Sequence, residues 1–214
     1  MIRVLIADDH RIVREGLRHL LEVEGGFEVA AEAADAVEAL NAARNVRFDI
    51  ALLDMSMPGR GGMELIRQMR FEFPDVKILV LSMHEQHEYA VRAIRAGASG
   101  YLTKDSAGRD LAAALRRIAA GGAYVSPEVA EQLALGAGGA SRADLPPHAL
   151  LSDREFQVMR MFVDGHSVSD IAGTLNLSVK TVSTHKSNIL QKMNMAGTAE
   201  LIRYAISHRL IDEQ

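Results

Sequence analysis

The sequence predicts an α/β domain with a doubly wound parallel sheet, followed by a smaller all-α domain. Three observations support this prediction. Up to about residue 120, five short runs of strand-forming residues alternate with helical patterns. A stretch rich in Gly, Ala and Pro follows at 136–149, and every pattern after Leu151 is helical. Alternating strands and helices imply parallel strands joined by right-handed crossovers, with helices on both faces of the sheet.

Each predicted strand of the first domain is a short apolar run, and each predicted helix has apolar residues at helical spacing. The strands are 3–8, 27–33, 49–54, 77–82 and 100–104. The helices are 12–22, 36–44, 62–72, 88–97 and 109–122, the last with a Gly-Gly stop. Five such units make a flavodoxin-like (βα)5 domain of about 120 residues.

The rest of the chain is predicted to contain a linker and a helical domain. A short helix is expected at 126–135, with Ser126 as its cap and Pro127 in its first turn. The composition of 136–149 is typical of a linker. Further helices are expected at 152–164, 168–174, 179–194 and 198–208. The predicted organisation is therefore a first domain over 1–121, a linker with a short helix over 122–147, and a second domain over 148–214.

Composition and charge exclude several classes of protein. The 214 residues contain no cysteine, which excludes disulfides and thiolate metal sites. No apolar run approaches the ~20 residues of a spanning helix, and the N-terminus has no signal pattern, so we expect a cytoplasmic protein without membrane contact. The net charge of −4 does not point to nucleic acid, yet no acid occurs between Asp170 and Glu200, a stretch with three lysines.

Polar side chains end four of the five predicted strands, at the sheet edge where ligands bind in open α/β sheets. In chain order they are Asp8 with Asp9, Asp54, Ser82, and Thr103 with Lys104. Three close carboxylates repel one another and need a cation, and Mg²⁺ takes carboxylates, a carbonyl and water. We expect the backbone carbonyl of Ser56 to join them. Each residue alone has a structural interpretation, such as a helix cap, but their coincidence at four strand ends favours a phosphoryl site on Asp54.

The stretches ADDH, LLDMSMPGRGG, LVLS and GYLTKD resemble the motifs of the receiver domain of bacterial two-component response regulators. The resemblance covers the first 120 residues. It implies that Asp54 accepts a phosphoryl group from a sensor histidine kinase. The Mg²⁺ ligands would be Asp9, Asp54 and the Ser56 carbonyl, with Asp8 assisting through water. It also implies that Ser82 and Lys104 contact the phosphoryl oxygens and that Tyr101 is the switch aromatic. The alternative for Tyr101 is an aromatic side chain that covers the edge of the sheet.

Two positions depart from the pattern of many receivers. Asp105 stands where many have a proline after the lysine, so no cis-proline can fix Lys104. Met83 stands where many have a small residue after the Ser or Thr. We expect the bulk of Met83 to slow the attack of water on an acyl phosphate.

The second domain has a helix-turn-helix pattern. LSDRE is a capping box in which Ser152 caps and Glu155 follows three residues later. Two helices joined by a short turn follow. On a helical projection of the second, the side expected to face a core carries Val179, Val182, Ile189, Leu190 and Met193. The opposite side carries Lys180, Thr184, Ser187, Asn188 and Gln191. Such hydroxyls and amides can bind base edges, although a plain solvated face is the alternative.

This segment resembles the LuxR/NarL-type helix-turn-helix over about 148–212. The resemblance implies that the chain binds double-stranded DNA. The residues expected at the major groove or its edges are Lys180, Thr181, Ser183, Thr184 and Ser187, with Lys186 and Lys192 near phosphates. Because some family members carry basic residues in place of Ser183 and Ser187, DNA shape is expected to contribute to recognition. His185 is expected to pack or cap, and TAELIRYAISHRL matches the family's dimerisation helix.

Together the two resemblances match the NarL/FixJ class of response regulators. They imply a transcription regulator, not an enzyme, in which phosphorylation of Asp54 shifts the receiver between two states. A homodimer would then bind two half-sites about one helical turn apart and act on the transcription machinery. Three alternatives remain open: a receiver that works without phosphate, an aspartate-nucleophile phosphatase, and a small-molecule sensor. The phosphatase usually needs a second Asp where Ser56 stands, and the sensor needs an apolar pocket rather than an acidic edge.

Overall fold

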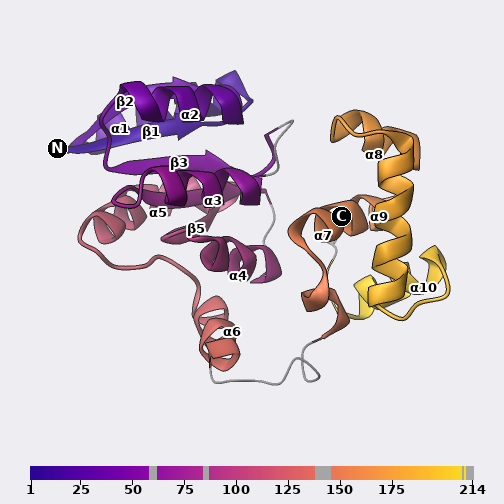
Figure 1. Ribbon diagram of the computed structural model, residues 1–214. Helices are drawn as coiled ribbons and strands as arrows, with labels where there is room; N and C mark the ends of the chain where they lie inside the picture. The colour runs from indigo at the N-terminus through magenta and orange to yellow at the C-terminus, as the bar shows by residue number, and fades with distance from the viewer. Residues whose placement is uncertain (58–61, 84–86, 138–145, 209, 211–214) are drawn as a thin grey trace. The chain divides into compact units, whose positions relative to one another are not determined.

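The structure, a computed structural model, describes residues 1–57, 62–83, 87–137, 146–208 and 210. The chain divides into two compact units, Met1–Ala130 and Glu131–Gln214, coloured in sequence order in Figure 1. The expected domain limits at 121 and 148 stay predictions. Within the expected linker, 138–145 lie outside the described residues, as do 58–61 of the loop after Asp54.

The first unit contains five parallel strands that alternate with helices, as predicted. The strands are β1 Ile2–Ala7, β2 Phe27–Ala33, β3 Ile50–Asp54, β4 Lys77–Ser82 and β5 Gly100–Thr103. The helices are α1 Arg11–Glu24, α2 Ala36–Asn45, α3 Gly62–Glu72, α4 His87–Ala96 and α5 Lys104–Ala119. The strand order is β2-β1-β3-β4-β5, and every neighbouring pair is parallel. This confirms the doubly wound fold.

Helices enclose the sheet in two groups. α1 packs beside α5, whereas α3 contacts both α2 and α4 (Figure 1). The core on the α1 and α5 side includes Val4, Ile6, Leu21, Leu111 and Leu115, none more than 1% exposed. Because side chains alternate along a strand, the buried neighbours of these strand residues form a second core on the opposite face. Each such large apolar side chain contributes roughly 1.5–3 kcal/mol when fully buried.

The chain continues beyond α5 along the outer edge of the sheet. Tyr124 forms an isolated parallel bridge with Gly100 of β5. The Tyr101 amide donates to the Tyr124 carbonyl at 2.8 Å, and the Tyr124 amide donates to the Ser99 carbonyl at 3.2 Å. The residues after α5 therefore pair with the edge strand.

The rest of the described chain is helical. The elements are α6 Pro127–Ala137, the 3₁₀ turn η1 Pro147–Leu150, α7 Asp153–Val163, α8 Val168–Thr174, α9 Val179–Lys192 and α10 Thr198–Ser207. Ser126 Oγ accepts from the Val129 amide at 3.4 Å, which agrees with its predicted role as the cap of α6. In the second unit, α7 packs on both α9 and α10, and α8 packs on α9. None of the described helices is long and apolar enough to cross a membrane.

Side-chain caps set the starts of the three helices that form the helix-turn-helix region. The Ser152 and Glu155 capping box is present at α7, as predicted, and an equivalent box of Ser167 and Asp170 begins α8. Ser178 caps α9 by accepting from the Thr181 amide at 3.0 Å. Between α8 and α9 the chain turns at Asn176, whose φ of 51° is a conformation that Asn tolerates well.

Two predictions about the helices were wrong, one about where a helix begins and one about which residue is buried. α5 begins at Lys104 rather than at 109, because Thr103 caps it by accepting from the Ser106 amide at 3.4 Å. Lys104 is therefore the first residue of a helix and not the last of a strand. Val179 is 52% exposed, although it was assigned to the core face of its helix. It is the first residue after the cap, and Val182 is the first wholly buried residue of α9.

Candidate functional site

Strand register brings the predicted site residues to one edge of the sheet. Ala7 of β1 pairs with Leu53 of β3, so Asp8 and Asp54 follow at the same level. Asp54 in turn pairs with Leu81 of β4, and Ser82 pairs with Thr103 of β5. Since Lys104 follows Thr103 directly, all four predicted strand ends meet at this edge.

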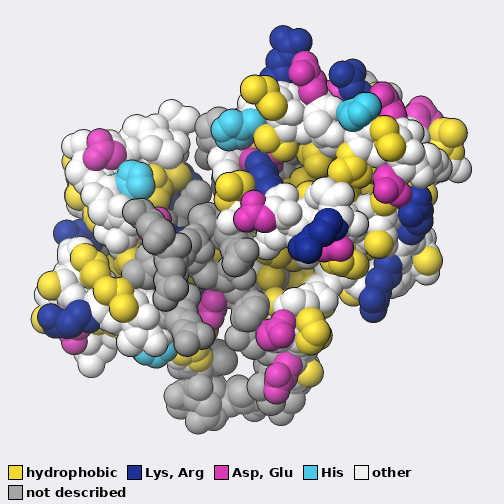
Figure 2. All heavy atoms as spheres, turned by 180° about the vertical axis from the view of Figure 1, so that it is seen from behind, with side chains coloured by type: hydrophobic (Ala, Val, Ile, Leu, Met, Phe, Trp, Pro, Cys, Tyr) yellow, Lys and Arg dark blue, Asp and Glu magenta, His cyan; other side chains and the backbone are white. Residues whose placement is uncertain are grey.

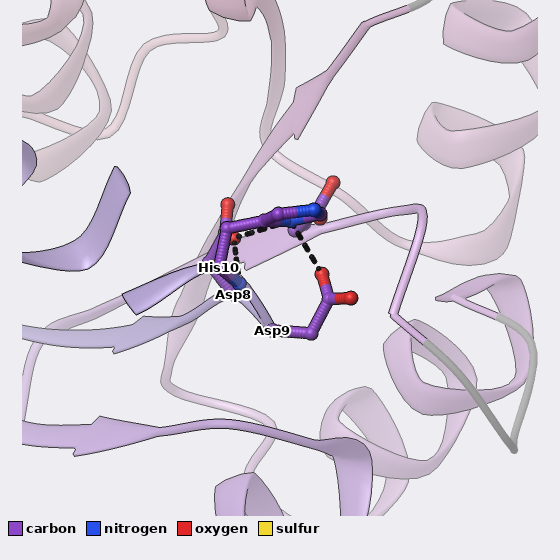
Figure 3. Close-up of side chains that lie close together, drawn as sticks. Asp8, Asp9 and His10 are labelled. Atoms are coloured by element: carbon purple, nitrogen blue, oxygen red, sulfur yellow. Dashed lines mark hydrogen bonds and ion pairs between the residues drawn. The ribbon is translucent and has the colours of Figure 1, made fainter. Parts of the chain in front are cut away.

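The carboxylates from β1 and β3 form a compact acidic pocket. Asp8 and Asp54 are each 1% exposed, whereas the Asp9 side chain is 27% exposed. One oxygen from each carboxylate and one ring nitrogen of His10 lie within 4.8 Å of one another. Figure 3 shows the side chains of Asp8, Asp9 and His10 turned toward one another at the end of β1. The pocket therefore combines ligand atoms from the end of β1 with one from Asp54 of β3, which lies at least 44 positions further along the chain.

Lys104 is the cation that bridges the two buried carboxylates. Its Nζ donates to Asp8 Oδ2 at 2.7 Å and lies 3.0 Å from Asp54 Oδ2. Burial works to lower the pKa of Lys104, but the hydrogen bond to Asp8 and the charge of Asp54 outweigh it and raise that pKa. The lysine is therefore held in its charged form.

Burial dominates the electrostatics of Asp54. It raises the pKa of this carboxyl, and the nearby charge of Asp8 adds to the rise. The Ser56 amide, which donates to Asp54 Oδ1 at 3.1 Å, and the charge of Lys104 oppose it. The Lys104 ammonium therefore does not offset the burial of Asp54, and a further positive charge would stabilise the ionised Asp54 carboxylate.

The pocket residues fit a divalent cation with oxygen ligands. Among the described residues, nothing donates a well-formed hydrogen bond to buried Asp9 Oδ1 or Asp54 Oδ2, although Lys104 is within ion-pair distance of the latter. Buried carboxylate oxygens without donors are typical ligands of Mg²⁺. The acidic pocket therefore fits the predicted Mg²⁺.

The two remaining pocket predictions concern Ser82 and Tyr101. Ser82 is wholly buried at the end of β4, beside β5. Tyr101 pairs with Val80 in the sheet and is 8% exposed, so its ring is packed. Ser82 therefore lies on β4 and Tyr101 on β5, the strand that Lys104 directly follows.

The predicted DNA-facing side of α9 is exposed and polar. Lys180, Ser183, Thr184, Ser187 and Asn188 are all exposed. The hydroxyls of Thr184 and Ser187 donate to carbonyls one turn earlier, at 3.0 and 3.1 Å, which leaves their oxygens able to accept from a ligand. On the face drawn in Figure 2, basic side chains are scattered among acidic and apolar ones rather than gathered in one patch.

Sequence comparisons identify both halves of this arrangement. Residues 4–116 match the family "Response regulator receiver domain", and residues 149–205 match "Bacterial regulatory proteins, luxR family". Response regulator UvrY of Escherichia coli K12 is 38% identical over 214 residues, covering 100% of this chain and 98% of UvrY. Response regulator GacA of Pseudomonas aeruginosa is 36% identical over 212 residues, 99% of each chain. The chain belongs to the response regulators with a LuxR-type DNA-binding domain.

Solved structures agree with this assignment. RcsB of Salmonella enterica serovar Typhimurium, bound to the promoter rprA in the presence of the phosphomimetic BeF3⁻, matches with a TM-score of 0.68 at 30% identity. The match covers 97% of this chain and 100% of RcsB. The response regulator is thus a DNA-binding transcription regulator of a two-component system, as its sequence predicted. Because the family consists of regulators, the phosphatase alternative is set aside.

Two lysines of the regulator are engaged within its own helical unit. Lys192 Nζ donates to Glu155 Oε2 at 2.6 Å, and the same carboxylate accepts from the Ser152 amide at 2.8 Å. Lys186 Nζ lies 5.2 Å from the centre of the Phe162 ring, within cation–π range. Their predicted contacts with phosphates would therefore compete with these partners.

Sequence reasoning missed two residues beside the acidic pocket. His10 occupies the cap position of α1 without capping it, and its Nδ1 lies 3.0 Å from Asp9 Oδ1. Arg14 donates to the Asp8 carbonyl at 2.6 Å and lies 3.4 Å from Glu32 of β2. A signal was present for both, because His10 follows the paired acids directly and Arg14 lies one helical turn beyond His10.

Proposed function

We propose that the regulator is switched by phosphorylation of Asp54 by a sensor histidine kinase, with Mg²⁺ held by Asp9, Asp54 and the Ser56 carbonyl. The observation that carries the proposal is the contact of Lys104 with both buried carboxylates, of Asp8 and Asp54, at the edge of the sheet where Asp9 also lies. Such a pocket is poised to bind a cation and then a phosphoryl group. Asp8 assists the metal through water.

In the transfer step, a carboxylate oxygen of Asp54 attacks the phosphorus atom of the phosphohistidine. The new O–P bond forms as the P–N bond breaks, and the electron pair returns to the kinase imidazole. Bound Mg²⁺ would stabilise negative charge on the phosphoryl oxygens. Lys104 supplies a second positive charge, and the Ser82 hydroxyl donates a hydrogen bond to the same group. The buried position of Asp54 excludes most water from the acyl phosphate.

The phosphoryl group then biases the receiver between two states. Ser82 moves toward the new charge, and Tyr101 is the switch aromatic that follows on the neighbouring strand. The strand pairing of β4 with β5 supports this coupling, since Ser82 and Tyr101 stand two residues apart in register. The receiver activity belongs to residues 1–121, and 122–147 link it to the DNA-binding domain at 148–214.

The DNA-binding domain places α9 in the major groove of double-stranded DNA. Lys180, Thr181, Ser183, Thr184 and Ser187 contact the groove or its edges, with Lys186 and Lys192 close to phosphates. A homodimer formed on phosphorylation binds two half-sites, and the doubled contact offsets the low net positive charge of each domain. It acts on the transcription machinery in the cytoplasm.

The test is intact mass and oligomeric state after incubation with Mg²⁺ and acetyl phosphate. We expect the wild type to gain one phosphoryl group and to shift toward dimer. Asp54→Asn should gain none, because the amide is a poor nucleophile. Asp105→Asn is the matched control, since Asp105 is an exposed acid beside Lys104 and should leave the adduct intact.

A second arm measures binding to promoter DNA with and without the phosphoryl donor. We expect tighter binding only for proteins that carry the adduct. An adduct on Asp54→Asn, or equal DNA binding with and without the adduct, would contradict the proposal. The second result would favour the phosphorylation-independent alternative.

A further inference from the structure

His10 brings a nitrogen ligand to a pocket otherwise made of oxygen atoms. It stands at the cap position of α1, where a polar side chain usually accepts from the helix, yet it makes no cap hydrogen bond. Its backbone amide is instead held by Asp8 Oδ1 at 2.8 Å. This hydrogen bond holds the backbone of His10 at the end of β1, and Figure 3 shows its ring beside the carboxylates of Asp8 and Asp9.

The distances around the imidazole match those between ligands of one metal ion. Nδ1 lies 3.0 Å from Asp9 Oδ1 and 3.5 Å from Asp8 Oδ1. In an octahedral site with bonds of about 2.1 Å, neighbouring ligand atoms are roughly 3.0 Å apart. One carboxylate oxygen of the fully buried Asp54 side chain also lies within 4.8 Å of the ligand atoms of the other three residues.

The donor set matters because metals differ in the ligands they prefer. Mg²⁺ prefers carboxylate, carbonyl and water oxygens, whereas ions of the later first transition series also favour imidazole. We propose that His10 is a metal ligand that makes the Asp8, Asp9 and Asp54 pocket bind such transition ions in preference to Mg²⁺. The inference rests on the metal pocket of the proposed function and adds a sensitivity of that pocket to transition ions.

A positioning role for His10 is the main rival explanation. If the ring only orients Asp9, its loss should weaken the binding of Mg²⁺ and of transition ions to a similar extent. If the ring is a ligand, its loss should weaken the binding only of the ions that favour nitrogen ligands. The ring is the more exposed partner, at 64% of its side chain, so replacing it should leave the core of the unit intact.

The experiment is calorimetric titration of untagged full-length protein with CoCl2 and, separately, with MgCl2, with visible absorption of bound Co²⁺ as a second readout. For His10→Ala we expect Co²⁺ affinity to fall at least about tenfold, with Mg²⁺ affinity changed by less than about twofold. The Co²⁺ spectrum should also shift as a nitrogen ligand is lost. A large excess of Mg²⁺ should displace Co²⁺ from the wild type, since both would occupy one pocket.

Matched variants separate this site from other histidines, of which the chain has eight in all. His19→Ala, an exposed histidine further along α1, should leave Co²⁺ affinity unchanged. Asp9→Asn should weaken the binding of both Co²⁺ and Mg²⁺. Equal losses for Co²⁺ and Mg²⁺ in His10→Ala, or Co²⁺ binding that survives it, would overturn the inference. Neither result bears on Asp54 phosphorylation in wild-type protein with Mg²⁺, which tests the proposed function separately.

Discussion

Lys192 is predicted to stabilise the helical unit through Glu155. The Glu155 side chain is 5% exposed and that of Lys192 is 43% exposed, so the pair lies between a buried and a surface ion pair. Breaking a buried pair costs about 3–5 kcal/mol, and exposed pairs are worth about 0.2–1 kcal/mol. After Lys192→Met, Glu155 still accepts from Ser152 at 2.8 and 2.9 Å, which limits the loss. We expect the unit to lose about 2 kcal/mol.

Amide hydrogen exchange of the full-length protein measures this loss locally. A loss of about 2 kcal/mol should speed exchange in α7 and α9 roughly 30-fold, with little change in the sheet of the first unit. Lys180→Met is the matched control, because Lys180 is exposed on the same helix and forms no ion pair among the described residues. Its exchange should change less than about twofold. Equal exchange in the two variants would refute the stabilising role of Lys192.

DNA binding distinguishes this role from the predicted phosphate contact. Each phosphate contact contributes about 0.9 to the slope of log affinity against log salt concentration. If Lys192 stays with Glu155 on DNA, Lys192→Met should leave that slope unchanged, while Lys186→Met, which removes the other lysine predicted to lie near phosphates, should reduce its magnitude. A lower slope for both variants would mean that Lys192 leaves Glu155 to meet DNA.

Three other predictions concern acid stability, packing and phosphate lifetime. Burial works to raise the pKa of Glu155, but hydrogen bonds from Lys192 and from Ser152 outweigh it and lower that pKa. The ionised carboxylate therefore stabilises the folded helical unit in full above about pH 5, and this stabilisation is lost as the pH falls through the pKa of Glu155 in the folded state. Glu155→Gln should therefore flatten the acid side of the stability curve of the helical unit, measured by urea unfolding at several pH values. Gly100→Ala should destabilise the first unit by about 1–3 kcal/mol, because its methyl group would lie 2.8 Å from Ile118 Cδ1 and 2.9 Å from a backbone oxygen. Gly108→Ala, with nothing within 4 Å, should instead stabilise it by about 0.5–1 kcal/mol in the same thermal unfolding assay. Met83→Ala should shorten the phosphoryl lifetime measured by intact mass, and an unchanged lifetime would discard the proposed shielding.

Sequence was sufficient for the fold because local patterns specify it. The alternation of strands and helices implies a parallel sheet, and the carboxyl ends of parallel strands meet at one edge. The proximity of Asp8, Asp54 and Lys104 could therefore be predicted from the sequence alone. The capping box at Ser152 is equally local. These features depend on residues only a few positions apart or on a general rule of topology.

Side-chain choices between several partners could not be predicted in this way. Lys192 and Lys186 were expected at phosphates, and nothing within α9 signals that Glu155 and Phe162 of another helix would attract them. The helical projection that placed Val179 in the core does not take into account where the helix begins. Val179 is in the first turn of α9 and is exposed, and the first buried side chain of this helix is Val182. His10 was overlooked because the sequence analysis expected a metal site made of carboxylate and carbonyl oxygens and did not count an imidazole nitrogen among the ligands.

The pairing of Tyr124 with β5 affects how the receiver could be isolated. An unpaired edge strand is a template for association with another chain. A fragment that stopped at Gly121 would remove Tyr124 and leave the amide of Tyr101 without its partner at that edge. Such a fragment would keep every residue of the acidic pocket and yet be prone to aggregation, so a shortened receiver is better ended beyond Val125.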